Sequence, residues 1–290
     1  MNRKILYIIM GILAVALVSC SKQKPQAKPV PKEAQDTAAP GEALEEFNSP
    51  DLGLWQLTGP VSGASYYAYE TKDTTALAHA GDDCDFDSLT FNREGLVTSM
   101  VNGIVEKGKK LVYSDLRFEY TPEGEFRSGR EAAEGGKGLV VKLSRTGGGY
   151  LQVLQVLGPD KELSADQSYY RLIEWANGIL AADNFETPGG NTRTKYHYNP
   201  QGLPDQVIAR TEDMGGDIVA TDTYTYQAFD KYGNWTQRRA VSVVEDTESE
   251  PDGTNRKTTK KTVYRLEKRY LYYYPPRTDG DAKPDTPPRR

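Results

Sequence analysis

One short unit recurs along the chain: an aromatic residue, three polar residues, a glycine and soon afterwards another large apolar residue. Its four full copies begin at Phe91, Tyr120, Tyr198 and Phe229. In each copy Asn, Thr or Asp is placed to open a turn through its side chain, and the glycine is placed to take the positive φ of a bulged hairpin loop. The unit therefore predicts strands that fold back on themselves as β-hairpins.

The units are evenly spaced. A shortened copy lies at Trp175–Ile179 and a degenerate one is centred on Gly148. The turn glycines, spaced 24 to 31 residues apart, are then Gly95, Gly124, Gly148, Gly178, Gly202 and Gly233. Such a period is typical of repeat proteins in which each hairpin buries its face against its neighbours.

Between the turns, large side chains alternate with a period of two, as in Leu89 and Phe91 or Tyr224 and Tyr226, which places each pair on one face of a sheet. The longest alternating run, residues 262–274, is predicted to pair with residues 232–244. No window of helical length shows a 3.6-residue period. The sequence predicts a single all-β domain over residues 51–274, an antiparallel sheet built from tandem β-hairpin repeats.

Composition excludes several classes of protein. The chain has 290 residues, a mean hydropathy of -0.66 and a net charge of -5. These values exclude a polytopic membrane protein and argue against a nucleic-acid partner, because binding phosphates requires a basic excess. Two cysteines exclude a disulfide scaffold.

The N-terminus has the features of an export signal. Arg3 and Lys4 precede an apolar run over residues 5–18, which is too short to span a bilayer as a helix. The run ends in Leu-Val-Ser-Cys, which resembles the bacterial lipobox. We expect residues 1–19 to be a lipoprotein signal peptide and Cys20 to carry the lipid that attaches the protein to a membrane. The alternative is an ordinary signal peptide that happens to end in Cys.

Two segments are expected to be disordered. Residues 20–50 are rich in Lys, Glu, Ala and Pro, with scarcely a large apolar side chain to bury, and are predicted to form a tether. Residues 275–290 are rich in Pro, Asp and Arg and are predicted to form a disordered tail.

Residues 224–238 and 89–98 resemble the YD-repeat (RHS-like) hairpins of uncharacterised lipoproteins of Bacteroidota, and residues 51–61 are similar to the first strand of those proteins. The resemblance implies an antiparallel sheet of successive hairpins and brings no shared catalytic motif. It also implies the bacterial outer membrane. Residues 21–24 lack the acidic signal that sends such lipoproteins to the cell surface, which favours the periplasmic face and leaves the surface open as the alternative. Asp36-Thr37-Ala38 resembles an O-glycosylation site of this phylum, so Thr37 is a candidate acceptor.

Few residues suggest catalysis or metal binding. Carboxylates at positions 1, 3, 5 and 12 of residues 83–94 match the spacing of an EF-hand loop, but Ser88 replaces its turn glycine, so we expect a solvated acidic face. Cys84 could be a nucleophile only with a nearby histidine, and the chain has just His79 and His197. We predict no catalytic residue, no metal and no cofactor.

Tyrosine is in excess, with 19 residues against 7 Phe and 3 Trp. Most of the tyrosines belong to the repeat, where cross-strand pairs stabilise a sheet. The cluster of Tyr270, Tyr272, Tyr273 and Tyr274 exceeds the repeat and is the candidate binding face for a glycan or protein partner. The expected function is a non-enzymatic envelope lipoprotein that acts as a binding or scaffolding module. The alternative is a hydrolase acting on envelope or dietary glycans through a pair of carboxylates.

Overall fold

A computed structural model describes residues 50–78, 82–131, 139–146, 149–157, 163–176, 179–187, 190–213, 216–248 and 256–275. The predictions for the signal peptide, Cys20, Thr37, the tether before Pro50 and the tail after Pro275 lie outside these residues. Over the described residues, no helix is long and apolar enough to cross a membrane.

The described chain forms one short helix and fourteen strands. They are α2 (Pro50–Leu54), β1 (Val61–Thr71), β2 (Cys84–Phe91), β3 (Val97–Glu106), β4 (Lys109–Tyr120), β5 (Phe126–Glu131), β6 (Leu139–Thr146), β7 (Gly149–Leu157), β8 (Leu163–Ala176), β9 (Ile179–Thr187), β10 (Gly190–Tyr198), β11 (Pro204–Asp213), β12 (Gly216–Phe229), β13 (Trp235–Glu248) and β14 (Lys257–Tyr273). The predicted all-β antiparallel fold is confirmed.

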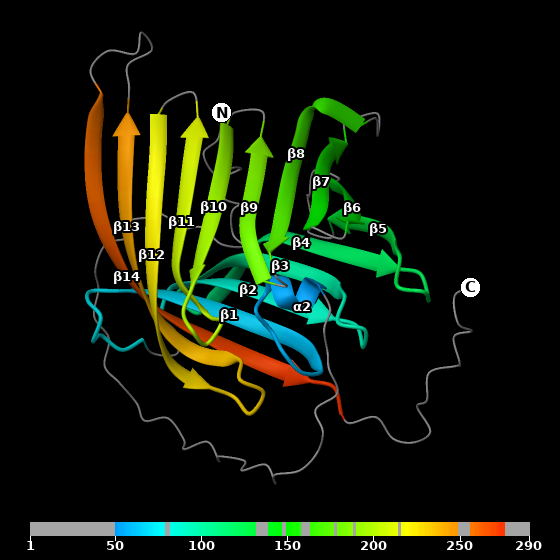
Figure 1. Ribbon diagram of the computed structural model, residues 1–290, viewed down its shortest axis with the longest axis horizontal. Helices are drawn as coiled ribbons and strands as arrows, with labels where there is room; N and C mark the ends of the chain where they lie inside the picture. The colour runs from blue at the N-terminus through cyan, green and yellow to red at the C-terminus, as the bar shows by residue number, and fades with distance from the viewer. Residues whose placement is uncertain are drawn as a thin grey trace.

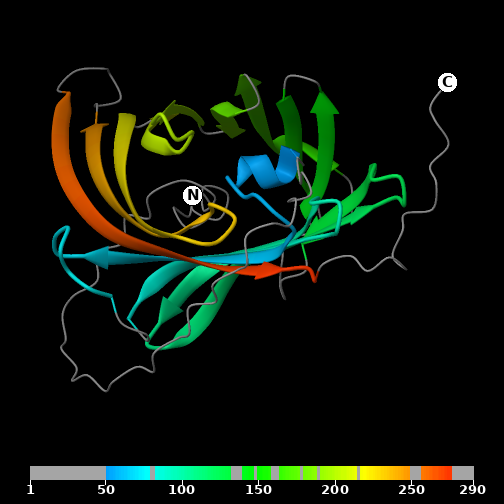
Figure 2. The ribbon, with the colours of Figure 1, turned by 60° about the horizontal axis from the view of Figure 1, so that its bottom comes forward.

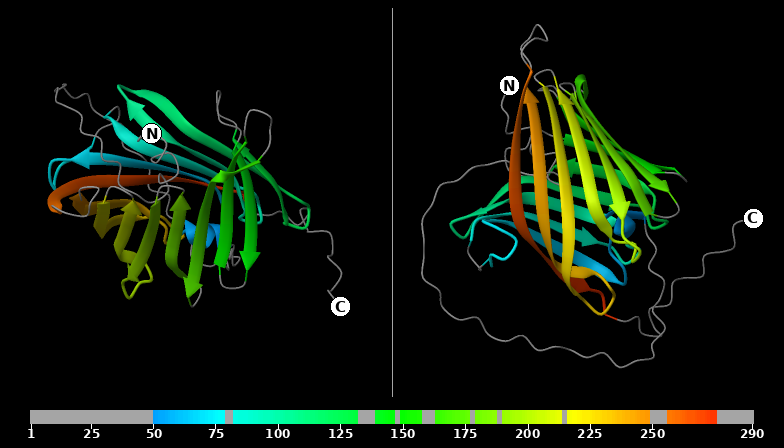
Figure 3. Two further views of the ribbon diagram at one scale, coloured as in Figure 1. Left: turned by 90° about the horizontal axis from the view of Figure 1, so that it is seen from above. Right: turned by 60° about the vertical axis from the view of Figure 1, so that its left-hand side comes forward.

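The strands form one closed barrel in which each strand pairs with its neighbours in sequence, and β1 pairs with both β2 and β14. Two walls face each other: β7 to β14 stand side by side in one, and β1 to β5 cross beneath them in the other (Figure 1). The long strands β12, β13 and β14 bend from the first wall into the second (Figure 3). The repeat predicted the hairpins, but not that the sheet would close on itself.

The hairpin turns have the geometry that the sequence predicted. Gly95, Gly124, Gly202 and Gly233 have φ of 75°, 83°, 75° and 80°. In each turn the glycine N–H donates to the carbonyl of the residue that opens the turn, as Gly95 does to Asn92 at 2.9 Å. Gly148 and Gly178 lie outside the described residues, between β6 and β7 and between β8 and β9. The repeat units are therefore the six consecutive strand pairs from β2 to β13, and their four described turns lie at one end of the barrel.

The expected first strand at residues 51–61 is wrong. These residues form α2 and a coil instead, and β1 starts at Val61. Side chains of this segment are buried on every side rather than on alternate positions, and they belong to the core between the walls: Leu52, Leu54, Trp55 and Leu57. Figure 2 shows α2 inside the ring of strands. A strand cannot bury consecutive side chains in one core, whereas a helical turn can.

The segment around α2 is tied to the first and last hairpins. The Asp51 carboxylate accepts the N–H of Val97 at 2.9 Å, next to the β2–β3 turn. The Asn234 side chain, after the β12–β13 turn, accepts the N–H of Thr58 at 2.7 Å and donates to its carbonyl at 2.9 Å. These bonds satisfy backbone groups that no strand pairs, and they hold residues 50–58 as a plug at the turn end of the barrel.

Tyrosine hydroxyls connect successive repeat hairpins. The side chains of Tyr120, Tyr198 and Tyr226 donate to backbone carbonyls of the preceding hairpin, at 2.8, 2.6 and 2.6 Å. Each acceptor lies two residues after a turn glycine: Val97, Leu180 and Pro204. A phenol suits this position because its ring packs in the core while its hydroxyl reaches a backbone carbonyl of the preceding hairpin. Much of the tyrosine excess is therefore a structural part of the repeat.

Candidate functional site

The inner face of the barrel has an apolar layer near the turns and a polar layer above it. Cross-strand partners point to the same face of the sheet, so the strand register shows which residues belong to each layer. One apolar row joins Leu271, Ala64, Leu89, Met100 and Leu116. The polar row one step further from the turns joins Arg269, Tyr66, Asp87, Asn102 and Ser114.

The prediction that the carboxylates of residues 83–94 form a solvated acidic face is wrong for Asp85 and Asp87. Asp85 and Asp87 alternate with Leu89 and Phe91 and point inward, while Phe86 faces out. Period-two counting from Leu89 and Phe91 would have placed both carboxylates inside, but the usual rule that polar residues face water pointed the other way. Within the described part of the chain, no cluster of His, Cys, Asp and Glu is arranged to hold a metal ion.

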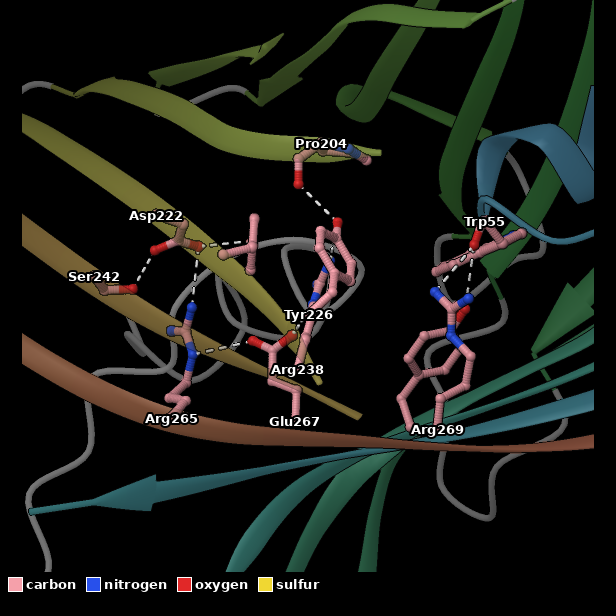
Figure 4. Close-up of polar contacts among 11 residues, drawn as sticks. Trp55, Pro204, Asp222, Tyr226, Arg238, Ser242, Arg265, Glu267 and Arg269 are labelled. Atoms are coloured by element: carbon pink, nitrogen blue, oxygen red, sulfur yellow. Dashed lines mark hydrogen bonds and ion pairs between the residues drawn. The ribbon is translucent and has the colours of Figure 1, made fainter. Parts of the chain in front are cut away.

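Four inward-facing charged residues of β12, β13 and β14 form a connected ion-pair network (Figure 4). The Arg238 Nε–Glu267 Oε2 distance is 2.6 Å, and Arg265 reaches Glu267 at 3.4 Å and Asp222 at 3.0 Å. Ser242 also donates to Asp222. All four charged side chains are nearly inaccessible to solvent, so each depends on its partners for the interactions that water would supply.

The pKa values in this network follow from its pairings. Burial alone would raise the pKa of Glu267, but Arg238 and Arg265 outweigh it and hold that pKa below its ordinary value. Burial also opposes the charge of Arg238, and Glu267 with the neighbouring tyrosines more than compensates, so the pKa of Arg238 is raised. The network stays charged on both sides at neutral pH. Each charged group of the network is already paired with another member of it, which indicates a structural role.

Arg269 and Trp235 link the network to the plug. The Arg269 guanidinium lies 3.7 Å from the Trp235 ring centroid and donates to the carbonyls of Trp55 and Gln56 at 3.2 and 3.3 Å. Burial lowers the pKa of Arg269 to about 10. Trp235 points inward only because the β12–β13 register shifts next to the turn, at Tyr226 to Phe229. Such bulges re-aim a side chain, and alternation alone does not predict them.

Asp85 and Asp87 differ from the network because neither has a hydrogen bond or an ion pair with another described residue. Both side chains face the interior and remain partly accessible to solvent. Burial raises the pKa of Asp85 to about 6, although Arg265 partly opposes the shift. Burial, helped by the charge of Asp85, raises the pKa of Asp87 well above its ordinary value. Among the described interior residues, this carboxylate pair is the best candidate for acid–base chemistry.

The predicted tyrosine cluster does not form one face. Tyr270 and Tyr272 point outward from β14 and are 48% and 58% exposed. Tyr273 points inward, where it donates to Asp230 and contacts the Tyr232 ring at a centroid distance of 4.6 Å. Tyr274 donates to the Phe91 carbonyl at 2.6 Å. Only Tyr270 and Tyr272 keep the predicted exposure, and the alternation along β14 already separated Tyr273 from them.

Tyr270 and Tyr272 belong to a larger aromatic surface, which we call the outer aromatic wall. It consists of outward-facing residues on β14, β1 and β2: Tyr270, Tyr272, Tyr67, Tyr69 and Phe86. Tyr270 and Tyr272 are its exposed members, Tyr67 is half-buried, and Tyr69 and Phe86 are buried. Tyr67 lies at its centre, with ring centroids 5.7 Å from Tyr270, 6.5 Å from Tyr69 and 6.5 Å from Phe86. The sequence predicted the β14 members, but adding Tyr67 and Phe86 required the closing β1–β14 register.

The other candidate residues are separated from one another. Cys84 is buried against Tyr69, and burial raises the pKa of its thiol to about 11, which leaves little thiolate at neutral pH. His197 is exposed on the outer face of β10. His79 lies outside the described residues.

No model of a known protein family matches the sequence, and no curated protein matches it. Among solved structures, one that is similar is a porin-like protein from Bacteroides uniformis ATCC 8492, with 11% sequence identity and a TM-score of 0.39. The match covers 73% of this chain and 98% of that one.

Proposed function

We propose that the protein is a non-enzymatic module of the bacterial envelope that binds glycans through the outer aromatic wall. In this proposal it is a YD-repeat-like lipoprotein, anchored through a lipid on Cys20 to the periplasmic face of the outer membrane. The observation that carries the proposal is the exposure of Tyr270 and Tyr272 on one face of β14, where Tyr270 contacts Tyr67. The accessible rings of Tyr270 and Tyr272 on a rigid sheet suit stacking against sugar rings, because tyrosine offers an apolar face and a polar tip.

Barrel closure favours binding over scaffolding by strand addition. Each described strand has a partner on both sides, so no free strand edge is available to pair with another chain. The side chains on the outside of the barrel are what a partner can meet. Among them, Tyr270 contacts Tyr67, and Tyr272 lies two residues further along the same face of β14, over Gly63.

A glycan array probed with the full chain in detergent tests the proposal. The double substitution Tyr270→Ala and Tyr272→Ala removes two stacking surfaces, each worth about 0.5 to 1.5 kcal/mol, and should weaken binding about tenfold. Phe229→Ala is the matched control, because Phe229 is equally exposed, at 49%, but lies at the β12–β13 turn. Binding that survives the double substitution, or that Phe229→Ala reduces as strongly, would exclude the outer aromatic wall.

Asp85 and Asp87 favour a second candidate, a glycan hydrolase. They are two residues apart on one face, and burial raises the pKa of both, as a general acid requires. In that case purified protein should release reducing ends from envelope or dietary glycans, with a loss of about a hundredfold or more in Asp85→Asn. An activity that is unchanged in Asp85→Asn would eliminate this pair as catalytic.

A further inference from the structure

We infer that the ligand of the outer aromatic wall is an anionic polysaccharide, one that carries carboxylate or similar acidic groups along its backbone. The inference rests on the proposed function and narrows it to one class of ligand. It is drawn from how the charged residues of the barrel are divided between the two faces of the strands that form this wall.

The four strands β14, β1, β2 and β3 contain five carboxylates, and every one is in the inward-facing alternation: Glu70, Asp85, Asp87, Glu106 and Glu267. The opposite face of the same strands therefore has no acidic side chain. This segregation is unexpected for a chain with a net charge of -5, because carboxylates normally prefer the hydrated face. An anionic polymer would meet no repulsive group along these strands.

Two lysines lie over the aromatic rings of the wall. Lys110 reaches from β4, with its Nζ 4.8 Å from the Phe86 centroid and 5.6 Å from the Tyr67 centroid. Lys268 lies at the other end, with its Nζ 5.6 Å from the Tyr69 centroid. Neither lysine has an ion pair with a described residue, and Lys268 Nζ also donates to the Ala78 carbonyl at 3.3 Å. Both ammonium groups are held at the rim of the rings, where they would contact acidic groups of a polymer that stacks on the wall.

Glycines on the outward face let aromatic rings approach the backbone of the wall. The Tyr272 ring covers Gly63, where an added Cβ would be 3.5 Å from its Cδ2 atom. At Gly103 an added Cβ would collide with the Leu111 carbonyl oxygen and would lie 3.0 Å from Cε1 of Phe86. A hydroxyl group lies next to Tyr270, since Ser65 is the register partner of that residue on β1. Exposed aromatic rings, a neighbouring hydroxyl and two lysines together match a sugar polymer that carries acidic groups better than they match a neutral one.

The test compares two polymers that differ only in charge. The full chain in detergent is run through native gels that contain either polygalacturonate or its fully methyl-esterified form, which keeps the same sugar rings. We expect polygalacturonate to retard the chain at a concentration about tenfold lower than the ester, and added salt to abolish that difference. The double substitution Lys110→Gln and Lys268→Gln should weaken retardation by polygalacturonate about tenfold and leave the ester unaffected.

The control is Lys195→Gln with Lys231→Gln, which removes the same charge from two exposed lysines outside the wall. Equal retardation by both polymers, with dependence on Tyr272, would overturn the inference while the proposed function stands. Retardation by neither polymer would overturn the inference, and the glycan array then decides the proposed function separately. If the lysine pair instead governs binding to phosphatidylglycerol vesicles, the wall faces a membrane and the inference is wrong.

Discussion

The substitution Asp85→Asn should stabilise the protein at alkaline pH. Asp85 has no hydrogen bond or ion pair with a described residue, and its pKa is raised to about 6. A carboxyl whose folded pKa lies above its ordinary value of about 3.9 favours folding below that value, and the contribution is lost as the pH rises through the folded pKa. Above both values the charged form costs roughly 3 kcal/mol, which partial solvent access reduces to about 1 to 3 kcal/mol.

The measurement is thermal unfolding of the wild-type chain and of Asp85→Asn at pH 8 and at pH 4. At pH 8 the variant should melt roughly 2 to 12 °C higher, since 1 kcal/mol corresponds to about 2 to 4 °C for a domain of this size. At pH 4 the difference should nearly vanish, because the wild-type carboxyl is then protonated in the folded state. Asp217→Asn, on the outer face of β12, is the control and should change little. A variant that is less stable at pH 8, or equally stabilised at both pH values, would refute the reasoning.

Three further predictions concern the interior and the turns. Glu267→Gln should destabilise the fold by about 3 to 5 kcal/mol in urea unfolding, because it leaves Arg238 and Arg265 without their shared carboxylate. The loss should shrink as the pH falls below about 4.3, where the unfolded chain takes up the proton, and on through the lower folded pKa of Glu267. Tyr226→Phe should cost about 1 kcal/mol in the same assay through its lost bond to the neighbouring hairpin, whereas the exposed Tyr272→Phe should cost nothing measurable. Gly233→Ala should cost about 1 kcal/mol in thermal unfolding, because its φ of 80° is unfavourable for alanine.

The hairpins were predictable because their signals are local. Asn92, Asn199 and Asp230 open their turns with the side-chain bonds that the sequence indicated, each accepting backbone N–H groups within the loop. Strand pairing between neighbours then follows, since each hairpin fixes its own register. The spacing of the turn glycines was therefore enough to predict most of the strand pairing.

Closure of the barrel and the plug were not predictable in this way. Closure depends on the pairing of β1 with β14, which lie at opposite ends of the domain. The helix at Pro50–Leu54 forms because Leu52, Leu54 and Trp55 can be buried together only once both walls exist. Tertiary packing decides such a segment, and its local pattern does not.

The candidate sites show the same division. Alternation along β14 placed Tyr270 and Tyr272 on one face correctly, but the prediction of one surface that also includes Tyr273 ignored that alternation. The inward position of Asp85 was missed because a general preference of carboxylates for water was given more weight than the period of two. In a barrel with a polar interior, the period is the stronger guide.

Hydroxyl-radical footprinting with and without polygalacturonate tests the central claim most directly, because it reports which side chains a ligand covers. If the outer aromatic wall is the binding surface, oxidation of Tyr270 and Tyr272 should fall on addition of the polymer, while oxidation of Phe229 and of Tyr113, which is 43% exposed on β4, stays constant. Protection of Tyr113 instead, with Tyr270 and Tyr272 unchanged, would contradict the account.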